Sequence, residues 1–224
     1  MVRKVFSLNH DFHLLIIDDG SPDGTADIVK RLQHEFSGKL FIEEREGKQG
    51  LGTAYILGFK WALSRQYEYI FEMDCDFSHN PDDLLRLYDA CHNQGADLSV
   101  GSRYTKGGGV DNWPFSRIFI SYFASVYVRL ITFIPVKDTT AGFVCYTRKV
   151  LESIDLSKIR FIGYAFQIEM KFATWKLGFK IKEVPITFTD RVEGTSKMSG
   201  GIVKEAVWGV LEIQWNSFFS YMKD

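Results

Sequence analysis

The sequence has almost no excess of positive or negative charge. Its 27 Lys and Arg residues nearly balance its 28 Asp and Glu residues, and the formal net charge at pH 7 is -1. Non-specific binding to nucleic acid depends on a surplus of basic side chains. We therefore do not expect nucleic acid as a partner, and any site for an anion must be local.

Cysteine is scarce, and its spacing excludes the common cysteine-based sites. The three cysteines, Cys75, Cys91 and Cys145, are far apart and odd in number. They form neither a CxxC pair nor the Cys and His spacing of a zinc site. The sequence therefore predicts reduced thiols in a cytosolic compartment.

The chain also lacks an uninterrupted apolar stretch of about 20 residues, the length that a spanning helix needs. The nearest approach is residues 118–136, which Arg129 interrupts and which Pro135 ends. We expect a buried helix here. An interfacial helix, with aromatic and basic side chains at headgroup depth, is the alternative. Because the N-terminus has no apolar signal core either, we predict a cytoplasmic protein with peripheral contact at the cytoplasmic membrane face.

What the chain does contain is a regular alternation of short apolar runs and helical patterns. This alternation predicts an α/β fold with a mostly parallel central sheet and helices on both faces. With 224 residues and 46% hydrophobic content, we expect a single domain over residues 1–224. The predicted strands are residues 12–17, 40–44, 69–73, 98–101, 143–146 and 180–188. The first predicted helix ends near residue 33, and the last begins at residue 201. Between them, helices are predicted at residues 51–64, about 81–93, 118–136 and 164–177.

Acidic residues follow two of the predicted strands. Asp18 and Asp19 come after the first strand, and Asp74 and Asp76 form an Asp-x-Asp tripeptide after the third. Ligands of open parallel sheets bind beyond the carboxyl ends of the strands. Two carboxylates turned towards one crevice can share a divalent cation with a diphosphate and so assist its departure. Acidic residues at strand ends are also often plain helix caps, so the tripeptide alone leaves both interpretations open.

Seven segments of the chain form an ordered series: IDDGSPDGTADIV, EREGKQGLGTAYILGF, EMDCDFSHNPDDL, GSRYTKGGGVDNWPFSR, DTTAGF, FQIEM and VPITFTDRVEGTSKM. The series resembles the motifs of the dolichyl-phosphate mannose synthases in glycosyltransferase family 2, over nearly the whole chain. The resemblance implies the GT-A fold, GDP-mannose as the donor, and Mg²⁺ or Mn²⁺ as the cofactor.

The resemblance also implies a donor site around the base, ribose, diphosphate and sugar of the nucleotide sugar. The residues carried over are Asp18, Asp19, Lys48, Gly50, Gly52, Asp74 and Asp76. Asp74 and Asp76 are the implied metal ligands. Some relatives carry a further metal-binding Gln two residues after the second Asp. Ser78 stands at that place here, which puts its role as a ligand in doubt.

Basic residues of the same segments are expected around phosphate groups of a lipid acceptor. They are Arg103, Arg117, Arg191 and Lys197. The two parallel N–H groups of a guanidinium match two phosphate oxygens. A phosphate monoester is already anionic at neutral pH, so it needs anchoring more than deprotonation. A lone Arg is more often a solvated surface charge, and the motif context favours the binding role.

Glu169 in FQIEM completes the candidate catalytic residues, with Asp76, Arg103 and Arg117. It lies in a predicted helix, either as an ordinary partly buried carboxylate or facing the acceptor phosphate or its arginines. Glu72 alternates to the other face of its strand and is interpreted as structural. His79 adjoins the Asp-x-Asp segment and is a weaker candidate for ligand contact.

The pattern departs from the family at the N-terminus. Family members begin with a strand and turn of the type VIIPTYNE, and Met1 falls where the helix after that turn is already under way. We expect the absent first strand to be central to the sheet, so that two strand edges are exposed and stability and activity are low. Three explanations are possible: the true start codon lies upstream, the chain has been cut, or the gene is a defective copy. An upstream start codon is favoured, because the other motifs are intact.

The leading hypothesis is inverting transfer of mannose from GDP-mannose to a polyprenyl (dolichyl-type) phosphate. Two alternatives remain open: a UDP-glucose transferase with the same mechanism, and a catalytically defective nucleotide-binding remnant. A dehydrogenase of the Rossmann type is disfavoured, because no GxGxxG follows the first strand. Membrane contact is expected to be peripheral or through a membrane-anchoring partner.

Overall fold

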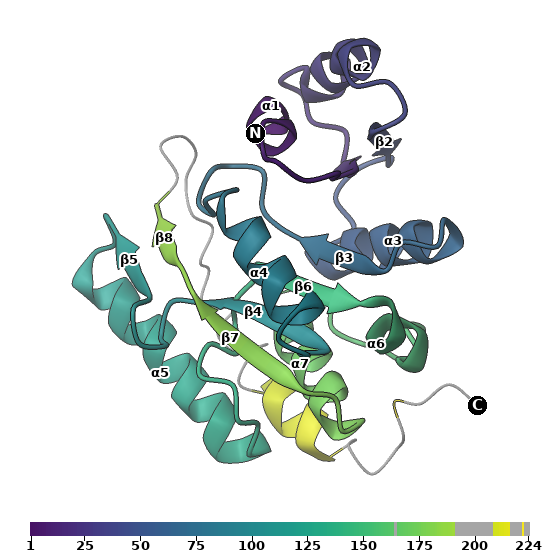
Figure 1. The fold of residues 1–224 in the computed structure, drawn as a ribbon. Helices are drawn as coiled ribbons and strands as arrows, with labels where there is room; N and C mark the ends of the chain where they lie inside the picture. Colours follow the sequence, from purple (N-terminus) through teal and green to yellow (C-terminus); the bar gives the residue numbers. More distant parts are fainter. Residues whose placement is uncertain (164, 191–207, 216–220, 222–224) are drawn as a thin grey trace.

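A computed structural model describes residues 1–163, 165–190, 208–215 and 221 (Figure 1). Its helices are α1 (Val2–Phe6), α2 (Thr25–Glu35), α3 (Leu51–Ser64), α4 (Asp83–His92), α5 (Phe115–Thr132), α6 (Arg148–Ser153) and α7 (Ala165–Lys176), with a further helix at 208–215. Its strands are β1 (Leu14–Asp18), β2 (Leu40–Glu44), β3 (Tyr69–Glu72), β4 (Leu98–Ser102), β5 (Gly109–Asp111), β6 (Val144–Thr147), β7 (Ile181–Pro185) and β8 (Thr187–Thr189).

The strands of the described residues form three sheets. A four-stranded sheet in the order β3-β6-β4-β7 lies in the middle of the molecule, and the pairs β1-β2 and β5-β8 form two smaller parallel sheets. Within the four-stranded sheet β4 and β7 are parallel, whereas β6 runs antiparallel to both β3 and β4. The predicted α/β class is confirmed, but the central sheet is mixed rather than mostly parallel. The connection from β4 to β6 passes through β5 and α5 and enters β6 at the end of the sheet where β4 leaves it, because Val100 pairs with Val144 and Leu98 with Tyr146.

Hydrophobic side chains cover both faces of the four-stranded sheet, as the sequence predicts. Successive side chains of a strand point to opposite faces. Along β6, Val144 and Tyr146 join the core cluster that contains the apolar side chains of α7, whereas Cys145 and the preceding Phe143 join the cluster that contains Leu87 of α4. The sheet is therefore held between α4 on one side and α7, with its neighbouring helices, on the other.

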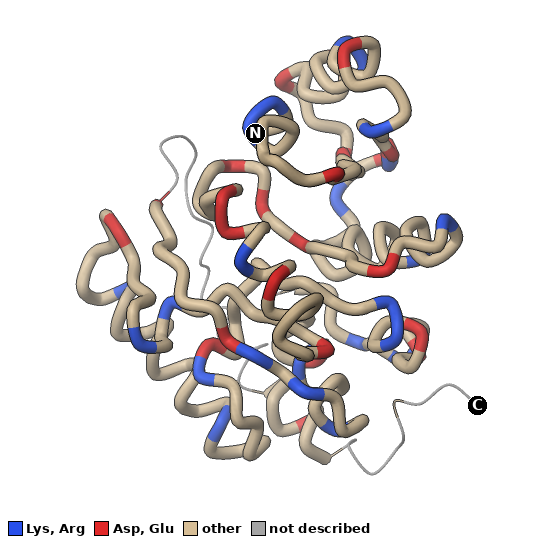
Figure 2. The backbone as a smooth tube through the Cα atoms, in the orientation of Figure 1, with Lys and Arg blue, Asp and Glu red and all other residues tan. Residues whose placement is uncertain are grey.

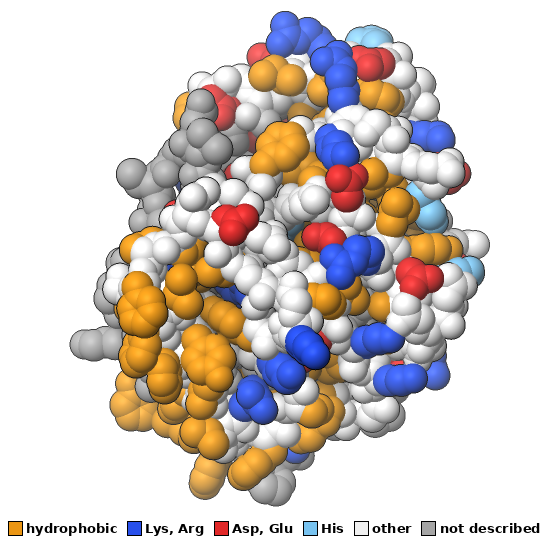
Figure 3. Space-filling view, turned by 60° about the vertical axis from the view of Figure 1, so that its left-hand side comes forward, with side chains coloured by type: hydrophobic (Ala, Val, Ile, Leu, Met, Phe, Trp, Pro, Cys, Tyr) orange, Lys and Arg blue, Asp and Glu red, His pale blue; other side chains and the backbone are white. Residues whose placement is uncertain are grey.

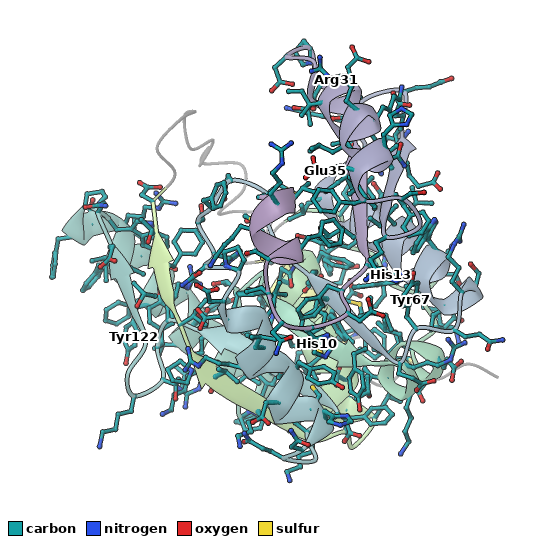
Figure 4. All side chains as sticks on the ribbon, turned by 45° about the horizontal axis from the view of Figure 1, so that its top comes forward. His10, His13, Arg31, Glu35, Tyr67 and Tyr122 are labelled. Atoms are coloured by element: carbon teal, nitrogen blue, oxygen red, sulfur yellow. The ribbon has the colours of Figure 1, made fainter. Side chains whose placement is uncertain are left out.

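The β1-β2 pair and α2 lie to one side of the four-stranded sheet (Figure 1). Among the described strands, β1 pairs with β2 alone and β3 pairs with β6 alone. Side chains join the two parts: the rings of Phe12 and Phe71 meet edge to face at 5.8 Å, and His13 Nδ1 lies 2.6 Å from Tyr67 Oη (Figure 4). Each of β1 and β3 therefore has one edge that pairs with no described strand.

Residues 180–188 form two strands instead of the one that the sequence predicts. β7 pairs with β4 as far as Pro185, and β8 pairs with β5 from Thr187. Ile186 connects the two sheets because its N–H donates to the Ser102 carbonyl and its own carbonyl accepts from the Gly109 N–H, both at 3.0 Å. The short elements α1, α6 and β5 were not predicted. The predicted start of the last helix, at residue 201, lies outside the described residues.

The apolar segment predicted at residues 118–136 is helical as α5, and it is buried on one face only. Ser125, Val128 and Thr132 are buried. The exposed large side chains on α5 and just after it are Phe115, Phe119, Ile120, Tyr122, Phe123, Leu130 and Phe133. Figure 3 shows hydrophobic side chains gathered over this part of the molecule. No helix among the described residues has the length and apolar character to cross a membrane.

Candidate active site

The loop after β1 is shaped by its first aspartate. Asp18, the last residue of β1, is buried and accepts hydrogen bonds from the backbone N–H groups of Gly20 (3.0 Å) and Ser21 (2.9 Å). Hydrogen bonding from Ser21 lowers the pKa of Asp18 below its ordinary value. Asp18 is therefore a carboxylate at neutral pH, and its described contacts shape the turn that carries Asp19.

Asp19 is held by an arginine that the sequence argument did not assign. Arg45 Nε donates to Asp19 Oδ1 at 2.6 Å, and Arg45 Nη1 donates to Thr53 Oγ1 at 2.7 Å. The Thr53 hydroxyl in turn donates to the Gly50 carbonyl at 2.8 Å. The Arg45 side chain is only 9% exposed, so this ion pair is shielded from bulk water. It ties the end of β1 to the start of α3.

The Asp-x-Asp segment begins two residues after β3 ends. Tyr55 Oη donates to Asp74 Oδ1 at 3.4 Å, and the Ser78 N–H donates to Asp76 Oδ1 at 3.0 Å. Burial raises the pKa of Tyr55 well above its ordinary value, so its hydroxyl stays protonated. Phe77, which follows Asp76, has φ 61 in the left-handed region that side chains other than glycine rarely adopt. Acidic positions continue along this loop towards α4 (Figure 2).

The two acidic loops meet at the start of α3. Thr53 is linked through Arg45 to Asp19, and Tyr55 is linked to Asp74. Helix N-termini present free backbone N–H groups and the positive end of the helix dipole, which favours anions. The structure thus brings the two acidic loops and the N-terminus of a helix into one region.

Glycines allow the chain to approach closely at this helix end. Gly50 has φ 99, and a Cβ there would lie 3.0 Å from the Ile162 side chain and carbonyl. The Gly52 N–H donates to the Ile162 carbonyl at 2.8 Å, and a Cβ at Gly52 would lie 2.8 Å from the Phe161 carbonyl oxygen. Lys48, in the preceding loop, is exposed. The two glycines therefore pack the start of α3 against residues 161–162.

Glu169 of α7 holds residues 160–161, next to the start of α3, by hydrogen bonds. Its carboxylate is 1% exposed and accepts the backbone N–H groups of Arg160 and Phe161, both at 3.0 Å. Burial raises the pKa of Glu169 to about 7. Glu169 thus holds the residues on which Gly52 packs, and it accepts hydrogen bonds from backbone groups rather than from the predicted arginines.

Arg103 is engaged in a buried ion pair. Its Nε and Nη2 donate to the two carboxylate oxygens of Asp138 at 2.8 and 2.6 Å, and Nη2 also donates to Thr140 Oγ1 at 2.9 Å. Burial works to raise the pKa of Asp138, but the Arg103 charge and the hydrogen bonds from Arg103 together outweigh burial and hold this pKa below its ordinary value. Glu183 of β7 also holds the backbone at Asp138, because its carboxylate accepts a hydrogen bond from the Asp138 N–H at 3.0 Å. A phosphate at Arg103 has to share the guanidinium with this carboxylate.

Arg117, in the first turns of α5, has a similar partner. Its Nη1 donates to both carboxylate oxygens of Asp190 at 2.9 Å, and its guanidinium carbon lies 4.1 Å from the centre of the Trp113 ring. The Arg117 side chain is 19% exposed, more open than Arg103. An anion can therefore reach Arg117 with less disturbance of the packing.

His79 connects the acidic and basic parts of the site. It is 3% exposed, and its ring packs against Phe143 and Phe188 with centroids about 5 Å apart. Burial and the Arg103 charge lower the pKa of His79 to about 4, while Asp76 acts in the opposite direction. Asp76 and Arg103 therefore both lie within electrostatic reach of one imidazole, which is neutral at physiological pH.

The predicted site residues separate into two groups. Asp19, Asp74, Gly50 and Gly52 gather at the start of α3, with Asp18 just behind, while Arg103 and Arg117 lie on the side of α5 and β8. Arg191 and Lys197 lie outside the described residues. No group of three or more His, Cys, Asp or Glu side chains that could hold a metal ion is found within residues 1–163, 165–190, 208–215 and 221.

The sequence matches the family model described as Glycosyl transferase family 2 over residues 1–155. The chain belongs to glycosyltransferase family 2. Two curated relatives agree with this assignment. Polyprenol monophosphomannose synthase of Mycolicibacterium smegmatis is 46% identical over 212 residues, which are 95% of this chain and 80% of the relative. Undecaprenyl-phosphate mannosyltransferase of Micrococcus luteus is 46% identical over 207 residues, 90% of this chain and 84% of the relative.

Solved structures show that this glycosyltransferase has the GT-A fold. Glucosyl-3-phosphoglycerate synthase from Mycobacterium tuberculosis, in complex with Mn²⁺, UDP and glucosyl-3-phosphoglycerate, superposes with a TM-score of 0.63. The superposition covers 91% of this chain and 69% of that one at 16% identity. At this identity the likeness establishes the fold alone.

Several residues that organise the site of this glycosyltransferase were missed by the sequence argument. They are Arg45, Thr53, Tyr55, Asp138 and Asp190, each of which contacts a predicted site residue. All five lie inside the motif segments, so their position in those segments was the available signal. Their roles depend on pairings between residues far apart in sequence, which the motifs do not specify.

Proposed function

We propose that this chain transfers mannose from GDP-mannose to a polyprenyl phosphate with inversion, giving a polyprenyl phosphate mannose. The observation that carries the proposal is the 46% identity to two enzymes named for this chemistry, over at least 90% of the chain. We further propose that residues 1–224 form one catalytic domain. The larger hydrophobic cluster supports this, because its members run from Phe59 to Tyr221, past the end of the family match.

The donor is proposed to bind at the start of α3. The diphosphate would lie near the helix N-terminus with Lys48, Gly50 and Gly52, and the nucleoside near Asp18 and Asp19. The ion pair between Asp19 and Arg45 and the hydrogen bond between Tyr55 and Asp74 support this placement, because they hold both acidic loops against α3.

Asp74 and Asp76 are the proposed ligands of Mg²⁺ or Mn²⁺. Carboxylate oxygens suit both ions, and Mg²⁺ is typically bound by one or two carboxylates together with substrate phosphates. The donor set therefore fits the metal. When bound, the cation supplies positive charge to the departing nucleoside diphosphate.

The acceptor phosphate is proposed to bind on the basic side of the site. Arg117 is the more accessible anchor, Arg103 is preorganised by Asp138, and Arg191 and Lys197 are proposed to contribute from outside the described residues. An ionised phosphate oxygen is already nucleophilic, so the protein has to hold it in line with the bond to the leaving diphosphate. Attack opposite that bond inverts the anomeric centre without an enzyme nucleophile. Glu169 contributes by supporting residues 160–162 beside the donor.

The lipid acceptor calls for membrane contact, and we propose that α5 provides it at the cytoplasmic face. Phe115, Phe119, Tyr122 and Phe123 follow helical spacing along one exposed face (Figure 3). Arg117 lies in the first turns of the same helix. An α5 that rests in the membrane interface therefore places the proposed phosphate anchor close to the headgroup level. A membrane-anchoring partner remains a further proposal.

A transfer assay tests the function directly. Labelled GDP-mannose and UDP-glucose are offered in parallel to the chain with undecaprenyl phosphate in detergent and Mn²⁺. We expect mannosyl transfer that chelation abolishes. Asp76→Asn should reduce it by roughly 100-fold or more, whereas Asp82→Asn, at an exposed position of the same loop, should not. Transfer of glucose in place of mannose, or donor binding without transfer, contradicts the proposal.

A further inference from the structure

A buried polar cluster lies between the four-stranded sheet and α7, away from the proposed substrate positions. Its members are Glu72 at the end of β3, Tyr146 of β6, and Gln167 and Lys171 of α7. None is more than 2% exposed. A buried lysine and a buried glutamate in one core are rare, because ionised groups are strongly destabilised away from water unless paired.

The contacts of the cluster centre on the Lys171 ammonium. Lys171 Nζ donates to the Ala141 carbonyl at 2.6 Å, the Gln167 carbonyl at 3.1 Å and Gln167 Oε1 at 3.2 Å. Tyr146 Oη donates to Glu72 Oε1 at 3.1 Å. The other Glu72 oxygen is buried without a well-formed hydrogen bond among the described residues. Burial raises the pKa of Glu72 to about 8, and the Lys171 charge and the hydrogen bond from Tyr146 act against that shift.

Lys171 is placed between the two halves of the proposed site. Glu72 is the last residue of β3 and stands two positions before Asp74, while Ala141 stands three positions after Asp138. Burial lowers the pKa of Lys171 to about 8, and the charges of Glu72 and Asp138 both oppose that shift. The Lys171 ammonium thus contacts the segment that follows Asp138 and lies within electrostatic reach of Glu72, two positions before Asp74.

Stability alone does not account for this arrangement. Well-packed apolar side chains of similar volume often replace buried charged groups without loss of stability. A fixed cation with directional hydrogen bonds does something that an apolar side chain does not, because it fixes the distance between the segments that it joins. Groups behind metal ligands commonly change metal affinity or activity by about 10- to 100-fold when removed.

We propose that Lys171 is a positioning residue that holds the Asp-x-Asp segment and the Asp138–Arg103 pair in one fixed relation. It acts through Glu72 on one side and through the Ala141 carbonyl on the other, without contacting substrate. The inference rests on the proposed function, since it assigns the donor to Asp74 and Asp76. It predicts that loss of Lys171 weakens binding of the metal and nucleoside diphosphate together.

Lys171→Met is the direct test, with Lys176→Met as the matched control, an exposed lysine five residues along the same helix. Calorimetry with Mn²⁺ and GDP, and separately with Mn²⁺ and UDP, measures the affinity. We expect roughly tenfold weaker binding for Lys171→Met and wild-type affinity for Lys176→Met. Equal affinity of the two variants contradicts the proposal.

The double variant Glu72→Gln and Lys171→Met guards against simple misfolding. It leaves no unpaired buried charge at these two positions, so its melting temperature should recover towards wild type. Its affinity for Mn²⁺ and nucleotide should stay weak, and its kcat for transfer low. A stable double variant that binds as tightly as wild type overturns the positioning role. If wild type binds Mn²⁺ with UDP but not with GDP, the proposed donor fails while the Lys171 comparison stands. If it binds neither, both proposals fail.

Discussion

Two of the arginines assigned to phosphate groups, Arg103 and Arg117, lie among the described residues, and each faces a carboxylate. Arg103 has Asp138, and Arg117 has Asp190. Such a partner holds a flexible guanidinium in one geometry before a ligand arrives, which reduces the entropy that binding has to overcome. The same partner competes with an incoming phosphate. The balance between these effects differs at the two arginines, because the Arg103 pair is more deeply buried.

Replacement of Asp138 by Asn should strongly destabilise the fold. It leaves the Arg103 charge buried without a counter-ion, and breaking a buried pair in this way costs about 3 to 5 kcal/mol. Asp11→Asn breaks the exposed pair with Lys39, where the Asp11 side chain is 74% exposed, and should change the stability far less. Urea unfolding of both variants measures the difference. Equal losses would show that the Arg103 pair is not special.

Glu169 should make the stability of the fold depend on pH. Its pKa rises from an ordinary 4.5 to about 7 in the folded chain, because burial disfavours the carboxylate. The folded state then holds a proton that the unfolded state releases between these values. Its contribution is complete below about pH 4.5 and is lost as the pH rises through about 7.

The variant Glu169→Gln removes this titration and keeps an acceptor for the two backbone N–H groups. Between about pH 5 and 8 its stability relative to wild type should rise, by at most about 3 kcal/mol. Glu46→Gln, at an exposed position, is the control. Urea midpoints across the pH range supply the measurement. A constant difference between Glu169→Gln and wild type contradicts the assignment.

The start of α3 leaves no room for a side chain at Gly52. A methyl group at Gly52 would lie 2.8 Å from both the Phe161 carbonyl oxygen and the Phe166 ring. Gly52→Ala should therefore shift residues 161–162, destabilise the fold by about 1 to 3 kcal/mol, and weaken nucleotide binding. Gly58→Ala, on the same helix, meets chiefly the end of the Ile17 side chain at 3.2 Å and should be neutral or stabilising. Thermal melts and GDP titration of both variants test this.

The exposed face of α5 should bind lipid bilayers. The rings of Phe119 and Phe123 pack in a tilted arrangement on this face with centroids 4.3 Å apart, and burial of each in a membrane is worth about 1.5 to 3 kcal/mol. Replacement of both by Ser should reduce co-sedimentation with phosphatidylglycerol vesicles by tenfold or more. Ile28→Ser, which removes an exposed side chain on α2, should have no effect. Vesicle binding that survives the Phe119 and Phe123 changes contradicts the membrane role of α5.

Over the complete chain, the sequence predicts local structure better than it predicts pairing. The strand at 40–44 and the helix at 51–64 are confirmed at their predicted bounds, because apolar spacing and flanking glycines are local signals. The antiparallel insertion of β6 and the transfer of residues 187–189 to a second sheet depend on tertiary contacts that no local pattern encodes.

The same division holds for the candidate site. The acidic loops were located because they follow strands, a rule that one segment of sequence can reveal. The partners Asp138 and Asp190 lie 35 and 73 positions from the arginines that they hold. Only the folded chain brings these residues together. The roles of the site residues themselves stay predictions for the experiments above.

The separation of β1 from β3 has a consequence for handling the protein. Each strand presents one row of peptide groups that no described strand covers, and β1 reads Leu-Leu-Ile-Ile-Asp. Such rows recruit the matching rows of other copies. As the protein concentration rises, we expect copies of the chain to pair through these strand edges and form β-rich aggregates. We expect this to happen before the chains aggregate through the exposed apolar face of α5. If aggregation proceeds in this way, a synthetic peptide of residues 14–18 should seed the formation of aggregates that bind thioflavin.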